Sequence, residues 1–259
     1  MSQEKTIAIT RSKDDSEEFI ELITKHNATP ITLPTIELVS KGEKIVDDFL
    51  NSVKTENPDY SVFMSSKAVK LLIESSKKIS KFEELRLAIA NTIVIAVGPK
   101  TKEALENEFE ISVNCPEENY DSEHLIKNNI FDNLQNKKVL IIRGKGGRET
   151  LKYMLEKKGA KVDYGECYIR NYLTIEQEKL NRELKNCTTI FILISSYGCA
   201  FQLEQSPNQW IGDYKTKFIV NHKKIEFSLR NGNYRSHLDD VIVTNDLSAK
   251  SLLEIIQNN

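Results

Sequence analysis

The chain has 259 residues, 39 % of them hydrophobic, and its 36 basic and 38 acidic side chains leave a formal net charge of -2. This length exceeds that of a typical single domain of roughly 100 to 200 residues, so two domains are expected. A net charge so close to zero supplies no overall positive field to recruit nucleic acid or an anionic membrane, and neither is expected as a partner.

The ends and the cysteines point to an intracellular protein. Residues 1–10 lack the apolar core of a signal peptide, and no apolar run approaches the roughly 18 residues that a membrane span needs, so we expect a cytoplasmic chain. A monomer is the simplest expectation for its oligomeric state. The cysteines form no C-x-x-C pair and the histidines show no ligand spacing, which favours reduced thiols and no metal site. These residues are Cys115, Cys167, Cys187 and Cys199, and His26, His124, His222 and His237.

In chain order, short runs rich in isoleucine and valine alternate with amphipathic segments. The runs are apolar throughout, as is typical of strands covered on both faces. They are Ile7–Thr10, Val62–Met64, Ile93–Val97, Val139–Ile142, Ile190–Ile194, Phe218–Val220 and Val241–Val243. Between them, Phe19, Ile20 and Ile23, and later Leu151, Met154 and Leu155, have the spacing that turns one helix stripe toward a sheet. This alternation predicts parallel sheets with right-handed crossovers.

Serines mark three of the expected helix starts, at Ser16, Ser122 and Ser248, because a serine side chain can cap the free N–H groups of a first turn.

One segment of the chain is repeated. Residues 138–172 contain an apolar strand that ends in Arg143, then a polar turn, an amphipathic helix and a second strand. Read without a gap, Ile7–Leu38 follows the same pattern, with Arg11 in the place of Arg143. The shared register predicts a duplicated α/β unit, and therefore two similar halves.

Loops after the strands are the expected place for a ligand, because parallel sheets present free N–H groups at the carboxyl ends of their strands. Most of these loops combine a hydroxyl or a glycine with a cation, which suits carboxylates or phosphates; each alone could be an ordinary helix cap. They are Arg11-Ser12-Lys13, Ser65-Ser66-Lys67, Gly98-Pro99-Lys100-Thr101, Arg143-Gly144-Lys145-Gly146-Gly147-Arg148, Ser195-Ser196-Tyr197-Gly198 and Asn221-His222-Lys223-Lys224.

The glycine-rich turn at 143–148 matches neither G-x-x-x-x-G-K-[ST] nor G-x-G-x-x-G, so no nucleotide cofactor is expected. Its glycines either allow a tight strand-to-helix turn or let the backbone approach an anion closely. No nucleophile motif such as G-x-S-x-G or H-E-x-x-H is found in the sequence. Chemistry alone therefore predicts a two-domain α/β protein for a small anionic ligand.

The order of these motifs resembles the uroporphyrinogen-III synthase family. In that family a strand ends in R-G-x-G-G-R, a helix with a leucine stripe and a G-x-x-V strand follow, and a V-Y-x-R junction closes the pattern. Arg143 to Arg148, Gly159 to Val162 and Cys167 to Arg170 match it here. Further matches in family order are Ile9-Thr10-Arg11, Pro34 with Ile36, Val62 to Val69, Ala96 to Thr101 and Tyr120-Asp121-Ser122.

The resemblance implies two similar flavodoxin-like α/β domains with parallel sheets flanked by helices, joined by a two-stranded β connection. The first domain would be discontinuous, from residues 1–36 and 173–259, and the second would span 40–167. The connections would lie near 37–39 and 168–172.

The implied reaction is the cyclisation of hydroxymethylbilane to uroporphyrinogen III, with inversion of the last pyrrole ring and loss of water, through a spirocyclic intermediate in the cleft between the domains. The substrate is a linear tetrapyrrole polycarboxylate, and no cofactor is implied. Tyr168 matches the family tyrosine at the domain junction and is the expected general acid. Substrate contacts are expected from Arg11, Ser65, Ser66, Lys67, Gly98, Thr101, Arg143, Gly144, Lys145, Arg148, Ser195, Ser196 and Lys223.

The chain departs from the family pattern in one loop of its last third and at two single positions. Asn221-His222-Lys223-Lys224 stands where the family has a G-x-x-T loop, and Met64 and Ile194 stand where a threonine is common. A non-catalytic scaffold that binds a tetrapyrrole or another anion and regulates by closing is the alternative hypothesis. An unrelated two-domain anion-binding protein is a second one.

Overall fold

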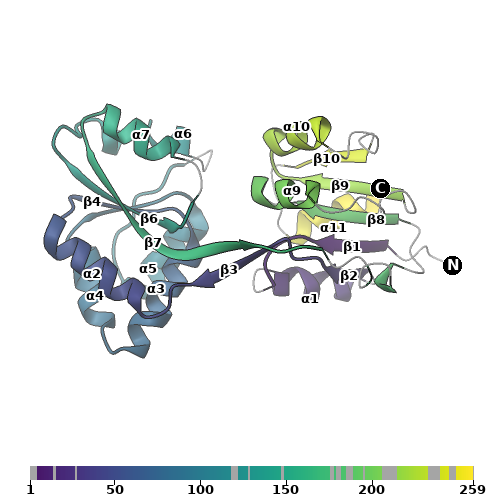
Figure 1. Cartoon of the computed structure of the whole chain (residues 1–259), viewed down its shortest axis with the longest axis horizontal. Coiled ribbons are helices and arrows are strands. Elements are labelled where there is room, and N and C mark those ends of the chain that lie inside the picture. The colour runs from purple at the N-terminus through teal and green to yellow at the C-terminus, as the bar shows by residue number, and fades with distance from the viewer. Residues whose placement is uncertain are drawn as a thin grey trace. The chain divides into compact units, whose positions relative to one another are not determined.

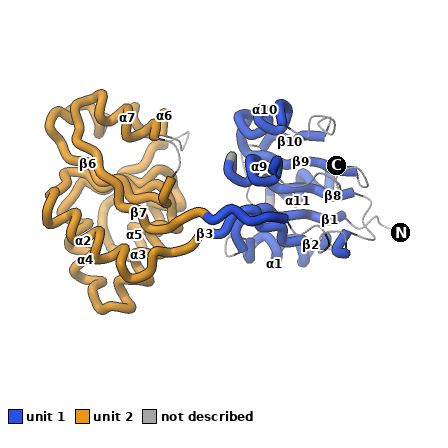
Figure 2. Tube along the Cα trace, in the orientation of Figure 1, with its two compact units in different colours: residues 1–38, 171–259 blue, residues 39–170 orange. Residues whose placement is uncertain are grey.

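The computed structural model describes residues 5–13, 16–26, 28–117, 122–127, 129–146, 149–175, 178, 182–184, 189–194, 196–205, 215–232, 240–244 and 249–258. The chain divides into two compact units: unit 1 comprises residues 1–38 and 171–259, and unit 2 comprises residues 39–170 (Figure 2). Unit 1 is therefore built from both ends of the chain, with unit 2 inserted between them.

Unit 1 contains a five-stranded sheet of order β10-β9-β8-β1-β2, in which every neighbouring pair is parallel (Figure 1). Its elements are β1 (Lys5–Ile9), α1 (Glu17–Lys25), β2 (Thr29–Thr32), β8 (Thr189–Ile194), α9 (Tyr197–Glu204), β9 (Lys215–Val220), α10 (Lys223–Asn231), β10 (Val241–Val243) and α11 (Ala249–Asn258).

Both faces of this sheet are covered. On one face Ile190, Ile192 and Phe218 pack against side chains of α9 and α10, such as Leu203 and Leu229. On the other face the alternate strand residues pack against the apolar stripes of α1 and α11. Two buried faces explain why the strands read as continuous apolar runs in the sequence.

Unit 2 has a sheet of order β3-β7-β6-β4-β5, in which β4 to β7 run parallel. Its elements are β3 (Ile36–Ser40), α2 (Lys44–Glu56), β4 (Tyr60–Phe63), α3 (Ser66–Lys78), α4 (Phe82–Ala90), β5 (Ile93–Ala96), α5 (Pro99–Phe109), α6 (Ser122–Leu125), a 3-10 turn (Asn129–Phe131), β6 (Lys138–Gly144), α7 (Thr150–Lys157) and β7 (Lys161–Tyr172). On one face Val62 and Ile141 pack against Leu125 of α6 and Leu151 of α7.

The two units are connected by β3 and β7, each of which crosses the boundary between them. The N–H of Lys41 donates to the carbonyl of Cys167 at 3.2 Å, and the N–H of Leu173 donates to the carbonyl of Thr35 at 3.0 Å. Higher residue numbers in β3 thus pair with lower ones in β7, so these two strands are antiparallel. The predicted fold class, two α/β domains with mostly parallel sheets and a two-stranded connection, is confirmed.

The repeat in the sequence corresponds to equivalent elements of the two units. The predicted segments are β1-α1-β2 in unit 1 and β6-α7-β7 in unit 2. In each unit the strand–helix–strand segment joins two neighbouring parallel strands of the sheet.

The helices predicted at Ser16 and Ser122 begin at these positions, but the predicted serine cap is not formed at Ser16. The helix α1 follows Ser16, but the Ser16 hydroxyl donates to the carbonyl of Ser12 at 2.8 Å and does not cap the helix. Ser122 is the first residue of α6, and Ser248 lies outside the described residues. Within the described part of the chain, no helix is long and apolar enough to cross a membrane.

Candidate active site

The carboxyl edge of the unit 2 sheet carries most of the predicted site residues. Ser65 follows β4 in an extended conformation, and its Oγ accepts the N–H of Ala68 at 3.2 Å, which caps α3. Ser66 and Lys67 form the first turn of that helix. Gly98 precedes α5, and Thr101 is buried in the first turn of α5. Because β5 is the edge strand, Gly98 and Thr101 lie farther along the sheet from β7 than Ser65 does.

A β-bulge places Tyr168 beside the end of β6. Arg143 pairs with Glu166, but Gly144 pairs with Tyr168, so Cys167 is an extra residue in β7. Beyond the bulge the N–H of Lys145 donates to the Tyr168 carbonyl at 2.6 Å. Bulges of this kind redirect a side chain and increase the local twist of a strand. The tyrosine at the domain junction is therefore held by the glycine-rich turn.

Gly144 is required because the Tyr168 ring occupies the space of a side chain at that position. A Cβ on Gly144 would lie 2.2 Å from Tyr168 Cε2, which is far inside van der Waals contact. Gly146 has a different role, since its φ of +69° is in the left-handed region that glycine adopts readily. Gly146 therefore serves the tight turn, whereas Gly144 makes room for the packing of the Tyr168 ring. Gly147 lies outside the described residues.

The Tyr168 side chain is buried, with 4 % of its surface exposed, and polar groups contact its hydroxyl. Ser65 Oγ lies 3.3 Å from the Tyr168 hydroxyl oxygen, and Arg170 Nη2 donates to the same oxygen at 3.4 Å. Arg170 is not among the site residues predicted from the sequence. The signal that could have found it is the two-residue spacing on a strand, which puts residues 168 and 170 on one face.

Arg143 is part of the scaffold of the turn and has little exposed surface. Its Nε donates to the Gly144 carbonyl at 3.1 Å, its Nη1 lies 3.3 Å from the Glu149 carboxylate, and its guanidinium carbon lies 4.5 Å from the centre of the Tyr164 ring. The Tyr164 hydroxyl also donates to Glu149. Burial, followed by this hydrogen bond, raises the pKa of Tyr164 above its usual value. Lys145, in contrast to Arg143, is exposed.

Unit 1 presents the equivalent loops at the carboxyl edge of its own sheet. Ser196 caps α9 by accepting the N–H of Cys199 at 3.2 Å, and Lys223 is the first, exposed residue of α10. The Arg11 guanidinium carbon lies 4.5 Å from the centre of the Phe19 ring. Arg148 and Ser195 lie outside the described residues.

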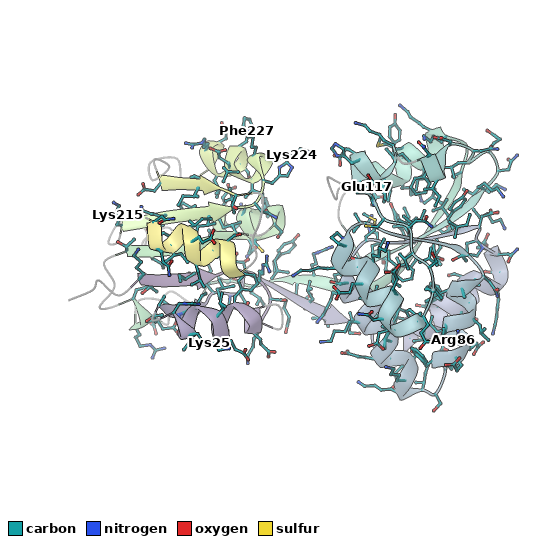
Figure 3. The ribbon with its side chains drawn as sticks, turned by 180° about the vertical axis from the view of Figure 1, so that it is seen from behind. Lys25, Arg86, Glu117, Lys215, Lys224 and Phe227 are labelled. Carbon is teal, nitrogen blue, oxygen red and sulfur yellow. The ribbon has the colours of Figure 1, made fainter. Side chains whose placement is uncertain are left out.

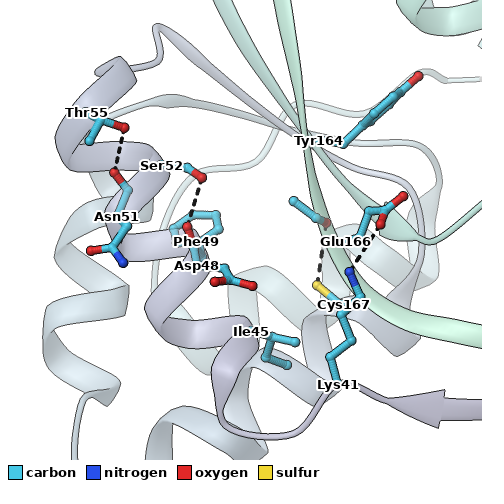
Figure 4. A pocket seen from close by; sticks show the side chains of 11 residues that line it. Lys41, Ile45, Asp48, Phe49, Asn51, Ser52, Thr55, Tyr164, Glu166 and Cys167 are labelled. Carbon is cyan, nitrogen blue, oxygen red and sulfur yellow. Dashed lines mark hydrogen bonds and ion pairs between the residues drawn. The ribbon is translucent and has the colours of Figure 1, made fainter.

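A separate pocket of about 480 Å³ lies between α2 and β7 (Figure 4). Lys41 and Glu166 form an ion pair of 3.1 Å on its wall. Cys167 also lines it, and burial raises the pKa of that thiol to about 12. Tyr168 does not line this pocket, so the candidate acid and the pocket are distinct features of one strand.

Among the described residues, no group of three or more His, Cys, Asp or Glu side chains has the arrangement of a metal site. Cys115, Cys167 and Cys199 are free thiols, and Cys187 lies outside the described residues.

The candidate site in unit 2 consists of the Tyr168 hydroxyl with Ser65 and Arg170, and the exposed residues Lys145 and Gly146 lie next to it. These groups can donate protons and bind carboxylates.

Comparison with known proteins agrees with the resemblance seen in the motifs. The family model described as uroporphyrinogen-III synthase HemD matches residues 17–218. Uroporphyrinogen-III synthase from Proteus mirabilis is 26 % identical over 208 residues, covering 80 % of this chain and 100 % of that protein. The corresponding protein from Salmonella typhimurium is 26 % identical over 166 residues, covering 62 % of this chain and 65 % of that protein.

Solved structures show the same fold. A mutant uroporphyrinogen III synthase from Thermus thermophilus aligns with a TM-score of 0.62 at 16 % identity, covering 98 % of this chain and 97 % of that chain. Uroporphyrinogen-III synthetase from Helicobacter pylori 26695 gives a TM-score of 0.62 at 15 % identity, with 98 % and 99 % coverage. Because the family model spans more than half of the sequence, the chain belongs to the uroporphyrinogen-III synthase family.

Proposed function

We propose that this chain cyclises hydroxymethylbilane to uroporphyrinogen III, with inversion of the last pyrrole ring and loss of water. The observation that carries the proposal is the family match over residues 17–218. The placement of Tyr168 at the carboxyl edge of the unit 2 sheet supports it, since this is the edge at which α/β sheets bind ligands.

In this mechanism Tyr168 is the general acid. Its hydroxyl passes a proton to the hydroxyl group of the substrate, the carbon–oxygen bond breaks, and water leaves. General acid assistance accelerates such a step by typically about 10²- to 10⁴-fold. The resulting cation is attacked by the substituted carbon of the last pyrrole ring, which gives a spirocyclic intermediate. The bond from that carbon to the neighbouring methylene bridge then breaks, and the cation left on the bridge is attacked by the other α-carbon of the same ring. Loss of the proton on that α-carbon gives the inverted, cyclic product.

The rest of the catalysis in this proposal is positional. Hydroxymethylbilane closes spontaneously without inversion, so the enzyme has to hold the chain in the geometry that leads to inversion. The N-termini of α3 and α9, at Ser65 and Ser196, offer N–H groups to the substrate carboxylates. Lys145, after β6, and Lys223, at the start of α10, offer cations. We propose that loops of both units take part in this binding.

The test is to supply freshly generated hydroxymethylbilane with and without the protein, oxidise the products, and separate the type I and type III uroporphyrin isomers. The proposal expects predominant type III with the protein. The same type I product as in the blank would refute the catalytic function and favour a binding scaffold.

The role of Tyr168 is tested in the same assay. Tyr168→Phe keeps the ring but removes the proton, so it is expected to lower turnover by about 10²-fold or more. Tyr153→Phe is the matched control, because Tyr153 is 57 % exposed on α7. A loss of less than about threefold in Tyr168→Phe would remove Tyr168 from the role of acid.

A further inference from the structure

Arg170 connects the candidate acid to the glycine-rich turn. It lies two residues after Tyr168 on β7, and its guanidinium carbon is 5.3 Å from the centre of the Tyr168 ring. Its Nη2 donates to the Tyr168 hydroxyl at 3.4 Å. Its Nη1 donates to the carbonyl oxygens of Lys145 and Gly146 at 3.3 and 3.1 Å. One side chain thus anchors both the turn and the hydroxyl.

The chemistry of arginine fixes the direction of the hydrogen bond at Tyr168. A guanidinium group remains charged and has no acceptor, so the Tyr168 oxygen must accept from Arg170. Ser65 Oγ accepts the N–H of Ala68, and in its 3.3 Å contact with the Tyr168 oxygen either atom can be the donor. Because Arg170 can only donate, the Tyr168 proton has to point away from Arg170.

We propose that Arg170 is a positioning residue, which orients the Tyr168 proton toward the substrate and stabilises the phenolate formed when that proton leaves. The proposal rests on the proposed function, since it requires Tyr168 to act as an acid. The proton moves from the Tyr168 oxygen to the leaving hydroxyl, and water departs as the carbon–oxygen bond breaks. The proton lost when the last pyrrole ring of the product is re-formed restores the tyrosine.

Replacing Arg170 is expected to reduce turnover more than substrate binding. Arg170→Met should lower kcat by about tenfold or more, because hydrogen bonds to charged groups contribute enough to change a rate by this factor. KM should stay within about twofold, since the effect belongs to the proton-transfer step. The kcat of Arg170→Lys should lie between those of the wild type and Arg170→Met. One ammonium group keeps the charge but cannot span both the turn and the hydroxyl.

A double-mutant cycle with Tyr168→Phe separates positioning from other roles. If Arg170 acts through the Tyr168 hydroxyl, Arg170→Met should cause less than about a twofold further loss of kcat in the Tyr168→Phe background. The control is Arg86→Met, because Arg86 lies on α4, where it pairs with Glu83 at 2.9 Å (Figure 3). This control should keep the kcat of the wild type.

Three outcomes would overturn the inference: equal factors of loss in both backgrounds, a raised KM with unchanged kcat, or an unchanged kcat in Arg170→Met. The second would make Arg170 a ligand of a substrate carboxylate instead. If Arg170→Met does not fold, Arg170→Lys carries the same cycle. Failure of the proposed function is recognised separately, because the wild-type protein would then form no type III isomer.

Discussion

Gly144→Ala tests whether the Tyr168 ring lies where the structure places it. The new Cβ would lie 2.2, 2.5 and 2.8 Å from Cε2, Cζ and Cδ2 of the ring, whereas carbon atoms in contact are about 3.5 to 4.0 Å apart. The ring must therefore move by more than about 1 Å. Because Gly144 does not have a left-handed φ, the backbone itself can accept alanine, and the effect comes from the ring alone.

Two magnitudes follow from this displacement. Overpacking of this kind typically lowers the free energy of unfolding by about 1 to 3 kcal/mol. A shift of 1 Å also breaks the contacts of the hydroxyl with Ser65 and Arg170, and misplacement of a reacting group by this distance can cost about 10²-fold in rate. We therefore expect Gly144→Ala to fold with reduced stability and to form type III product about 10²-fold more slowly.

The measurements are urea unfolding and the initial rate of type III formation, each compared with Gly165→Ala. Gly165 lies on the same strand as Tyr168, and a Cβ there would be 3.6 Å from its nearest neighbour, an ordinary contact on Ile142. This control should unfold and react like the wild type. A kcat within threefold of the wild type in Gly144→Ala, with the control also unchanged, would refute the reasoning.

Three further predictions concern unit 2. Ser65→Ala removes the cap of α3 and should lower the free energy of unfolding by about 1 kcal/mol in a urea titration; no change would mean that the cap is replaced by water. Ser61→Ala should be neutral or stabilising in the same experiment, because the buried Ser61 hydroxyl has no hydrogen-bond partner among the described residues; clear destabilisation would reveal one. Asp59→Asn should be less stable than the wild type at pH 7, since the hydrogen bond from Lys137 holds the pKa of Asp59 below its usual value. A lowered pKa stabilises the fold above the unfolded value of about 3.9, and this stabilisation is lost as the pH falls through the lowered pKa of the folded state. A difference between variant and wild type that does not shrink as the pH falls below about 3.9 would exclude this cause.

Much of the fold could be predicted from the sequence because its signals are local. Apolar runs of isoleucine and valine indicated the strands, and the ungapped repeat placed Arg11 and Arg143 at equivalent strand ends. The helices α2 and α4 were not selected, although both contain buried apolar residues. The Ser16 hydroxyl bonds to Ser12 and not to the helix, a choice between two local partners that the residue type does not decide.

The residues chosen from the sequence for the candidate site remain a prediction, and the structure shows which of them are in contact. Tyr168, Ser65, Gly144 and Lys145 are joined by contacts between three different strand ends, and motif order selected all four. The extra residue at Cys167, which sets the register of β7, leaves no local pattern in the sequence. Arg143 resembled a substrate ligand, but only tertiary packing shows that its guanidinium is held by Glu149 and Tyr164.

The two duplicated segments differ at the residues that place the candidate acid. In the alignment of the repeat, Ile36 corresponds to Tyr168 and Ser12 corresponds to Gly144. Glycine at position 144 has no Cβ, and this leaves room for the Tyr168 ring. The proposed proton donor therefore belongs to only one of the two repeated segments, which suits a reaction whose leaving group is a single hydroxyl at one end of a chain of similar rings.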